Sequence, residues 1–438
     1  MQLRDVGSSS GLNAFAGFSI GYERAKIAYV GGLILWETPS SPGSVVIWCI
    51  LPYPDVAWQF FLTMSSSSTL VSLPSMEPKD ENTLQRFNLN ELKRQANVPA
   101  KFLWPKVDLV GTEGVFDEPL VDLEGFIKGD EIATAKAIDL VRAACTTHGF
   151  FQVINHGVHA HLIQAAYREI DTVFELPFDR KLGFEQKLGG YAGFSSAHAE
   201  RFSTNLPWKE TFSLGYRGTD SDSALVDYFT SALGHDFENV GRVYQKYCEK
   251  MRELSLMIME LLALSLGLDR SYYRKFFEDG TSVMRCNYYP PCKKSDVTFG
   301  TGPHCDPNSI TLVHQDHVGG LEIFTGDKWL AVPPRQDVFA INIGDTFMAF
   351  CNGRYKSCVH RAILNEEKVR RSLVYFVNPK EDVVVRPPED LVDLDSGRVY
   401  PDFTWASLFD FANNRYRAGL QTLQDFFPWL SSQPKLLT

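Results

Sequence analysis

The chain has 438 residues, 44% of them hydrophobic and 22% charged, so it is long and apolar enough to bury a large core. Its formal charge of −10 argues against nucleic acid as a partner, because binding phosphates requires a basic surface. None of the eight cysteines forms a CxxC pair, which favours buried free thiols in a reducing compartment, and hence a cytoplasmic protein, over a disulfide framework.

The N-terminal 63 residues differ in texture from the rest of the chain. Gly-, Ser- and Pro-rich pieces alternate there with two apolar runs, Ile27–Trp36 and Val45–Met64. The first run is too short to cross a bilayer, and two prolines and an aspartate interrupt the second. We therefore expect no membrane span, place residues 1–63 outside the working fold as an extension, and take Met64 as a natural start.

Residues 64–97 are polar and predict a mobile leader, and residues 98–270 predict a mainly helical N-terminal region. The elements expected there are a short strand at 119–123, a helix at 130–147, a strand at 149–154 with a turn at 155–157, and helices at 159–174 and 237–266. In the helix at 130–147, Ile132, Ile138, Val141 and Cys145 are spaced to form one buried stripe. Residues 188–222, rich in Gly, Ser and aromatic residues, predict irregular structure.

Residues 271–400 predict a β-rich core. Short runs of Val, Ile, Phe and Tyr alternate there with Gly, Pro and Asn, and predict strands at 309–313, 321–324, 338–343, 359–364 and 372–377. This pattern is typical of an antiparallel β-barrel or jelly roll. Residues 401–438 return to a helical pattern and predict a C-terminal cap. The expected fold class is α+β.

Two histidines and a carboxylate in this core have the composition of an Fe(II) oxygenase site, which leaves coordination positions open for a co-substrate and oxygen. His304 and Asp306 are two residues apart, so in a strand both side chains point to one face. His360, in a later apolar run, can complete the triangle from another strand. We predict that these three residues bind iron and carry the catalysis.

A second His-x-Asp pair, His314 and Asp316, competes with the first. The first pair is favoured because Pro307 follows it and fixes the exit backbone, whereas the second runs straight into the Gly319-Gly320 turn. Spacing alone leaves both pairs open as ligands.

Arg370 and Ser372 share one face of the strand that returns after a turn at 365–368. A guanidinium binds a carboxylate through two parallel hydrogen bonds, and a hydroxyl can add another. The placement of this pair shortly after His360 predicts a site for a carboxylate co-substrate beside the metal.

Several motifs resemble those of the plant 2-oxoglutarate- and iron(II)-dependent dioxygenases. They are Asn287-Tyr288-Tyr289-Pro290-Pro291-Cys292, His304-Cys305-Asp306-Pro307, Gln315-Asp316-x-Val318-Gly319-Gly320-Leu321, His360-Arg361-Ala362 and Arg370-x-Ser372, with His148–Gly157 upstream. The resemblance runs from Val98 to Leu430. It implies a double-stranded β-helix, or jelly-roll, core between the N-terminal helical region and the C-terminal helices.

Within this family, the sequence resembles the gibberellin 20-oxidases more closely than the other subgroups. Their signature is similar to Leu206-Pro207-Trp208-Lys209-Glu210-Thr211, to Ile343–Ala349 and to Asn352–Cys358. By this resemblance His304, Asp306 and His360 are the iron ligands. Arg370 and Ser372 hold the distal carboxylate of 2-oxoglutarate, and Tyr289 and Asn287 assist them.

The resemblance also implies the reaction. Carbon-20 of a gibberellin precursor is oxidised in successive turnovers and lost, while 2-oxoglutarate is decarboxylated to succinate with O2 as co-substrate and ascorbate as supporting reductant. The substrate is then a diterpenoid acid, and we expect a monomeric enzyme. Lys209 is a candidate partner for the substrate carboxylate, and a salt bridge from Lys209 to Glu210 or Asp220 is the alternative.

Two other functions stay open on the sequence. One is a plant dioxygenase that acts on another gibberellin carbon or on a flavonoid. The other is a cupin-like protein that binds metal without turning over 2-oxoglutarate.

Overall fold

The computed structural model describes residues 27–30, 33–37 and 45–49, and residues 86–433 except 93, 96, 186–191, 200, 393–396 and 416–421. The chain divides into two compact units, residues 1–74 and 75–438. The first contains an antiparallel sheet of β1 (Ile27–Val30), β2 (Leu33–Glu37) and β3 (Val45–Cys49). Among the described residues, no helix is both long and apolar enough to cross a membrane. The assignment of residues 1–63 to an extension outside the working fold stays a prediction.

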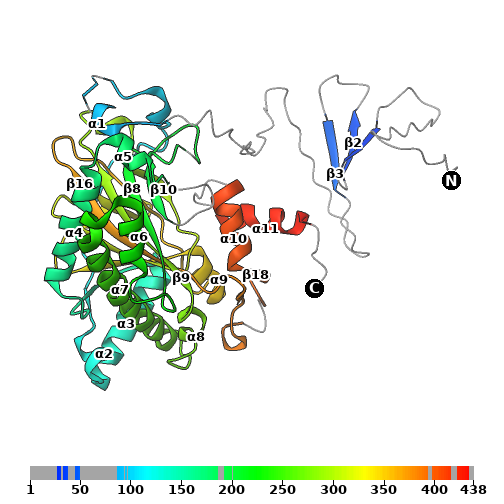
Figure 1. The fold of residues 1–438 in the computed structure, drawn as a ribbon. Helices are drawn as coiled ribbons and strands as arrows, with labels where there is room; N and C mark the ends of the chain where they lie inside the picture. Colours follow the sequence, from blue (N-terminus) through cyan, green and yellow to red (C-terminus); the bar gives the residue numbers. More distant parts are fainter. Residues whose placement is uncertain are drawn as a thin grey trace, which may run out of the picture. The chain divides into compact units, whose positions relative to one another are not determined.

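The second unit is built around two mainly antiparallel sheets, with strand orders β5-β6-β14-β11-β16-β9-β8-β7 and β10-β15-β12-β13-β4 (Figure 1). The larger sheet contains β5 (Val121–Asp122), β6 (Phe150–Ile154), β7 (Gly193–Ser196), β8 (Glu210–Arg217), β9 (Thr281–Tyr289), β11 (Ile310–Gln315), β14 (Phe339–Ile343) and β16 (Arg370–Val377). The smaller sheet contains β4 (Gly114–Val115), β10 (Thr301–His304), β12 (Leu321–Thr325), β13 (Lys328–Ala331) and β15 (His360–Ala362). The predicted α+β fold with a jelly-roll core is confirmed.

Helices cover the outer face of the larger sheet, where α7 packs against α3, α4 and α6 (Figure 1). The helices are α1 (Leu89–Leu92), α2 (Glu124–Lys128), α3 (Glu131–Thr147), α4 (Ala160–Phe174), α5 (Phe178–Leu182), α6 (Ala224–Leu233), α7 (Glu238–Ser265), α8 (Arg274–Phe277), α9 (Asp345–Phe350), α10 (Trp405–Asp410) and α11 (Thr422–Ser432). A two-stranded antiparallel sheet of β17 (Val384–Val385) and β18 (Phe403–Thr404) is formed before α10. The predicted helices at 130–147, 159–174 and 237–266 are therefore present, and α10 and α11 fall in the predicted helical cap.

Strand β16 shows how the larger sheet separates its two faces. Leu373, Tyr375 and Val377 are buried in the core shared with the helices, whereas Val374 belongs to a second cluster between the two sheets. Because alternate side chains of a strand point to opposite faces, Arg370 and Ser372 lie on the same face as Val374. The polar residues at the start of β16 therefore enter the space between the sheets.

The buried stripe predicted for the helix at 130–147 is wrong at its first position. Asp130 caps α3 by accepting hydrogen bonds from the backbone N–H groups of Ile132 and Ala133. Ile132 therefore lies in the first turn, where its side chain is 87% exposed. Val141 and Cys145 are buried as predicted.

The irregular structure predicted for residues 188–222 is also wrong, since β7 and β8 lie there. Strand β8 pairs with β9 from Glu210–Tyr288 to Arg217–Thr281, and β7 pairs with β8. In β8 the apolar residues Phe212, Leu214 and Tyr216 alternate with small or polar ones, a strand pattern that the prediction overlooked. Strand β7, of sequence Gly-Phe-Ser-Ser, has one large apolar residue and no such pattern. Helices α6 and α9 and strand β13 were not predicted either.

The end of the predicted leader belongs to the folded unit. Phe87 and Leu89 are buried, and the Phe87 ring meets Phe102, which in turn meets Trp208, edge to face. The part of the leader before residue 86 lies outside the described residues. The seven cysteines whose side chains are described are buried and free, as predicted.

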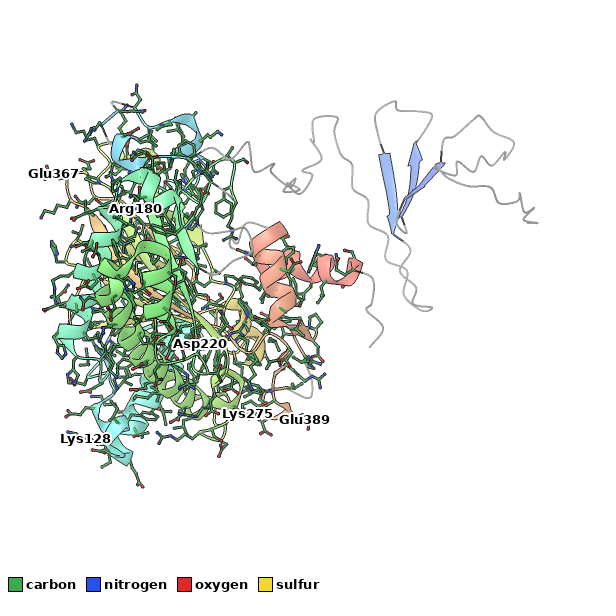
Figure 2. The ribbon with its side chains drawn as sticks, viewed as in Figure 1. Lys128, Arg180, Asp220, Lys275, Glu367 and Glu389 are labelled. Carbon is green, nitrogen blue, oxygen red and sulfur yellow. The ribbon has the colours of Figure 1, made fainter. Side chains whose placement is uncertain are left out.

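Charged side chains lie at the periphery of the second unit. Those labelled in Figure 2, among them Lys128, Asp220 and Glu389, are all exposed. Some charged side chains are buried, and they include two ion pairs, Lys181–Glu210 and Arg361–Glu322, each with an N–O distance of 2.6–2.7 Å.

Two glycines offer a matched test of how tightly the sheet is packed. Gly149 and Gly157 have φ of +72° and +79°, but a Cβ on Gly149 would lie 2.0 Å from the Lys356 carbonyl oxygen, whereas a Cβ on Gly157 meets nothing within 4 Å. We expect Gly157→Ala to lower the free energy of unfolding by about 1 kcal/mol through backbone strain alone, and Gly149→Ala by about 3 kcal/mol. Urea unfolding measures both, and equal losses would contradict the role of the collision.

Candidate functional site

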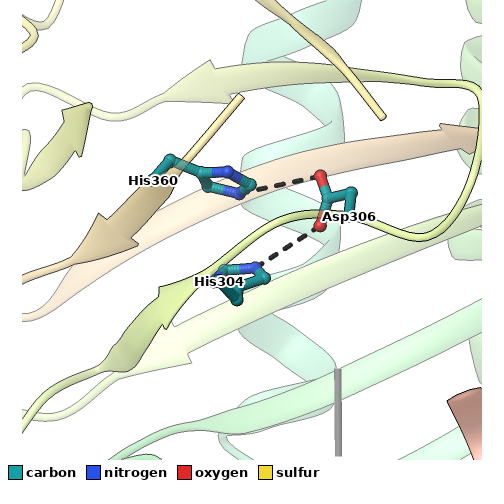
Figure 3. Close-up of side chains that lie close together, drawn as sticks. All are labelled: His304, Asp306 and His360. Carbon is teal, nitrogen blue, oxygen red and sulfur yellow. Dashed lines mark ion pairs between the residues drawn. The ribbon is translucent and has the colours of Figure 1, made fainter. Parts of the chain in front are cut away.

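His304, Asp306 and His360 come together at one point between the two sheets, with one ligand atom of each lying within 4.8 Å of the others (Figure 3). His304 Nε2 lies 3.4 Å from Asp306 Oδ1, and His360 Nε2 lies 3.6 Å from Asp306 Oδ2. Asp306 and His360 are buried, and His304 is partly exposed. Two imidazoles and a carboxylate in this arrangement fit a divalent iron held on one face.

Strand pairing sets this arrangement. His304 ends β10 and is directly opposite His360, the first residue of β15, in the antiparallel register. Asp306 lies in the loop after β10, where its carbonyl accepts a hydrogen bond from the Asp345 N–H. The expectation that His304 and Asp306 point from one strand is therefore wrong, because the strand ends at His304 and the loop turns Asp306 back toward the imidazoles.

Hydrogen bonds hold both imidazoles in the tautomer that binds metal through Nε2. His304 Nδ1 lies 2.9 Å from the Gly302 carbonyl oxygen, and His360 Nδ1 lies 3.1 Å from that of Cys358. Burial, followed by the nearby His304, lowers the pKa of His360 to about 4. At neutral pH this ring is therefore uncharged and offers its lone pair.

The third ligand is kept ionised. Burial by itself would raise the pKa of Asp306, but His360, His304 and the Thr311 hydroxyl outweigh it and hold the pKa below its ordinary value. Thr311 Oγ1 donates to Asp306 Oδ2 at 2.6 Å, which fixes the carboxylate plane. Neither Thr311 nor Asn342, whose Nδ2 lies 3.3 Å from His360 Nε2, was singled out from the sequence. No short sequence motif indicates that Thr311 and Asn342 contact the site, because they reach it through the pairing of β11 with β14.

The competing pair is occupied by structural contacts. His314 is buried, and Tyr167 Oη lies 3.0 Å from its Nδ1 while the Gln336 carbonyl lies 3.2 Å from its Nε2. Asp316 accepts hydrogen bonds from the backbone N–H groups of Val318 and Arg371. Both ring nitrogens and the carboxylate of this pair are thus engaged with protein groups, which favours His304 and Asp306 as the candidate metal-binding pair.

The four residues predicted to hold a co-substrate are brought together by the pairing of β9 with β16. Arg370 is opposite Tyr289, and Ser372 is opposite Asn287, whose Nδ2 donates to Ser372 Oγ at 3.1 Å. The Arg370 guanidinium lies 4.6 Å from the centre of the Tyr289 ring. All four side chains are buried and line the same cavity as the metal ligands.

Arg370 has the features of an anion-binding group. Its Nε donates to the Gly319 carbonyl, and its Nη2 lies 3.5 Å from Gln315 Oε1. Its Nη1 is buried without a hydrogen-bond partner among the described residues, as is Asn287 Oδ1. A buried guanidinium is expensive to leave unpaired, so Nη1 has the environment of a group that meets a ligand carboxylate. Arg371, on the other face, instead pairs with Asp171 and Asp316.

The cavity has a volume of about 250 Å³ and opens between the two sheets beneath α10. The metal ligands and the Arg370 group lie within it. Its remaining wall carries aromatic and cationic side chains that include Trp104, Phe202, Arg285, Phe376 and Trp405. Such a wall suits an apolar molecule that bears a negative charge.

Lys209 lines the same cavity. Its Nζ donates to Thr301 Oγ1 at 3.0 Å, and burial lowers the pKa of Lys209 to about 8 even though Tyr289 acts to raise it. The alternative salt bridge to Glu210 or Asp220 is wrong. Glu210 pairs with Lys181, and Asp220 accepts from the Arg217 backbone.

Two family models match the chain. The 2OG-Fe(II) oxygenase superfamily model covers residues 280–379, and the model described as non-haem dioxygenase in morphine synthesis N-terminal covers residues 119–231. The first range contains the candidate metal ligands His304, Asp306 and His360 and the cluster of Arg370, Ser372, Tyr289 and Asn287.

Curated proteins match over most of the chain. Gibberellin 20 oxidase 1 of Arabidopsis thaliana is 49% identical over 347 residues, which is 79% of this chain and 92% of that protein. Gibberellin 20 oxidase 1-B of Triticum aestivum is 47% identical over 350 residues, which is 79% of this chain and 95% of that protein. A crystal structure of JOX2 in complex with 2OG, Fe and JA is 27% identical with a TM-score of 0.68, and the match covers 78% of this chain and 98% of that one.

The ligand assignment can be tested by metal binding. We expect His304→Ala and Asp306→Ala each to lower Fe(II) affinity by more than 100-fold, because each removes one of three ligands. His314→Ala should retain iron, since this ring is engaged by Tyr167 and Gln336. Anaerobic Fe(II) titration of the three variants measures this, and equal loss in all three would refute the choice of pair.

Proposed function

Since the chain belongs to the 2OG-Fe(II) oxygenase superfamily, we propose that this 2-oxoglutarate- and Fe(II)-dependent dioxygenase acts on gibberellin precursors, oxidising carbon-20 in successive turnovers until it is lost. The identity of 47–49% to gibberellin 20 oxidases over 79% of the chain carries this proposal. We further propose a cytoplasmic monomer that uses ascorbate to keep its iron reduced.

The residues present fit the iron that this chemistry requires. His304, Asp306 and His360 offer three ligands on one face, and their orientation is fixed by Gly302, Cys358 and Thr311. Bound iron and 2-oxoglutarate together supply an oxidant for an unactivated C–H bond. The chain contributes the fixed ligands, the ionised Asp306 and the neutral His360.

The co-substrate's distal carboxylate is assigned to the cluster around Arg370. Arg370 Nη1 and the Ser372 hydroxyl point into the cavity from one face of β16, and Tyr289 and Asn287 face them from β9. A five-carbon diacid held at this end can reach the metal with its other carboxylate, because the two groups line one continuous cavity. These roles for Arg370, Ser372, Tyr289 and Asn287 are proposals.

The rest of the cavity is left for the substrate. Its aromatic wall offers an apolar surface to the body of the substrate. The same wall does not by itself distinguish a gibberellin from a flavonoid, so a plant dioxygenase that acts on a flavonoid or on another gibberellin carbon is the alternative. The relatives' names favour the first reading.

Two neighbouring arginines test whether Arg370, Ser372, Tyr289 and Asn287 bind the distal carboxylate of 2-oxoglutarate. These four residues are called the carboxylate clamp below. Arg370→Ala should raise the KM for 2-oxoglutarate on the order of 10- to 100-fold, as expected for losing charge-assisted hydrogen bonds to a carboxylate. Arg371→Ala should lower stability by about 1–2 kcal/mol through loss of its contacts with Asp171 and Asp316 and leave that KM within about twofold. Succinate formation at varied 2-oxoglutarate concentration measures the KM of each variant, and urea unfolding measures its stability. A larger rise in KM for Arg371→Ala than for Arg370→Ala would show that the co-substrate binds on the other face of β16.

The substrate is tested with the full chain. Incubated with Fe(II), ascorbate and 2-oxoglutarate, the enzyme should convert gibberellin precursors to alcohol, aldehyde and carbon-20-free products, one succinate forming per oxidation. Mass spectrometry of the products measures this, with flavanones as the comparison. Turnover of flavanones but not gibberellin precursors would reject the proposed substrate, and iron binding without succinate formation would favour a metal-binding protein that is not an enzyme.

A further inference from the structure

Lys209 lies beside the carboxylate clamp, level with Tyr289 in the larger sheet. In the antiparallel register, Glu210 at the start of β8 is opposite Tyr288 of β9, which places the preceding residue, Lys209, level with Tyr289. On its other side, Tyr289 is opposite Arg370 of β16. Tyr289 is therefore flanked along one row of the sheet by two cations, and all three side chains line the cavity.

A chain of hydrogen bonds joins Lys209 to the clamp. Lys209 Nζ donates to Thr301 Oγ1 at 3.0 Å. The Tyr289 side chain is hydrogen-bonded to Thr301 and to Ser372. Ser372 Oγ also accepts from Asn287 Nδ2 at 3.1 Å. Four of these five residues are buried and Thr301 is partly buried, so the chain of hydrogen bonds lies largely out of water.

The groups at its two ends set the direction of this chain. The ammonium of Lys209 has only hydrogens to donate, whereas a hydroxyl both donates and accepts. Because Lys209 donates to the Thr301 oxygen, the Thr301 hydrogen is directed to Tyr289, and the Tyr289 hydrogen is then left for Ser372 or for a ligand. Ser372 accepts from Asn287 and likewise keeps its own hydrogen to donate. A carboxylate accepts hydrogen bonds and donates none, so this direction suits a carboxylate bound at the clamp.

The charge of Lys209 acts on Tyr289 in the same sense. Burial by itself would raise the pKa of Tyr289, but Lys209, followed by Arg370, lowers it, which makes the Tyr289 hydroxyl a stronger donor. Burial lowers the pKa of Lys209 itself to about 8, while Tyr289 acts to raise it. Arg285 and then Arg370 also act to lower the pKa of Lys209, and Asp306 acts to raise it. Lys209 therefore still carries its charge at neutral pH.

We propose that Lys209 is a positioning residue of the 2-oxoglutarate site, which acts through Thr301 to orient the Tyr289 hydroxyl as a donor to the distal carboxylate. The inference rests on the proposed role of the carboxylate clamp and is independent of which substrate the enzyme oxidises. It assigns to the co-substrate a lysine for which the sequence suggested the substrate carboxylate as partner.

The test uses Lys209→Met, which removes the charge and the donors at nearly constant side-chain volume. Anaerobic titration of the Fe(II)-loaded enzyme, followed by the visible absorption of the iron–2-oxoglutarate complex, measures binding. The comparison ligand is 2-oxopentanoate, which has a methyl group in place of the distal carboxylate. Lys209→Met should weaken binding of 2-oxoglutarate by about 5- to 20-fold and that of 2-oxopentanoate by less than about twofold. General damage to the site would weaken both ligands alike.

Three further variants test the route from Lys209 to the carboxylate. Thr301→Val removes the hydroxyl at nearly constant volume and should reproduce the selective loss, and it decides the question if Lys209→Met does not bind Fe(II). Lys209→Arg keeps a charged donor and should retain part of the affinity for 2-oxoglutarate. The double variant Lys209→Met/Tyr289→Phe should bind 2-oxoglutarate within about threefold of Tyr289→Phe alone, because the hydroxyl through which Lys209 acts is already absent.

Two controls separate this inference from the proposed clamp. Arg370→Ala should lose the preference for 2-oxoglutarate over 2-oxopentanoate, and Lys128→Met, at an exposed lysine paired with Glu124, should leave both affinities unchanged. If Arg370→Ala loses that preference while Lys209→Met and Thr301→Val keep it, the inference alone is overturned. The same holds if Lys209→Met raises the KM for the substrate and leaves 2-oxoglutarate binding unchanged. An Arg370→Ala enzyme that keeps the preference would overturn the proposed clamp and this inference with it.

Discussion

The pairing of β10 with β15 is the contact on which the rest of the site depends. It places His304 opposite His360 although they are 56 positions apart in the chain, and it ends where the chain turns, which brings the Asp306 carboxylate back to face both rings. Backbone carbonyls on the same two segments orient both imidazoles. Metal geometry here is a consequence of strand register, so any shift of one residue would turn a ligand to the opposite face.

The larger sheet gives the site its second half because both of its faces are buried. Its outer face packs against the helices and forms the main hydrophobic core. Its inner face lines the cavity, where polar side chains can bind a ligand instead of being buried without partners, which would cost free energy. Arg370 with Tyr289, and Ser372 with Asn287, are cross-strand pairs of this inner face. One pair of strands, β9 and β16, therefore provides the four side chains of the cluster around Arg370.

Two buried ion pairs lie next to residues of the site, on the opposite side of the strands that carry them. Glu210 follows Lys209 and points to the other face, where it meets Lys181 of α5, and Arg361 follows His360 and meets Glu322 of β12. Trp329 and Phe299 stack on the Arg361 guanidinium. Breaking such a pair leaves a buried charge, so these residues hold the adjacent site residues in one position. The same alternation that turns Lys209 and His360 inward turns their neighbours outward.

The sequence by itself determined the chemistry, because ligand types and their motifs are local: His304-x-Asp306, His360 and Arg370-x-Ser372 could be assigned from residue type, spacing and resemblance. It also determined the long amphipathic helices, whose periodicity is local. Only the tertiary structure decided between His314 and His304, because engagement by Tyr167 and Gln336 is a long-range contact. Likewise the pairing of β8 with β9, which lie far apart in the chain, is what places Ser213 beside Arg285.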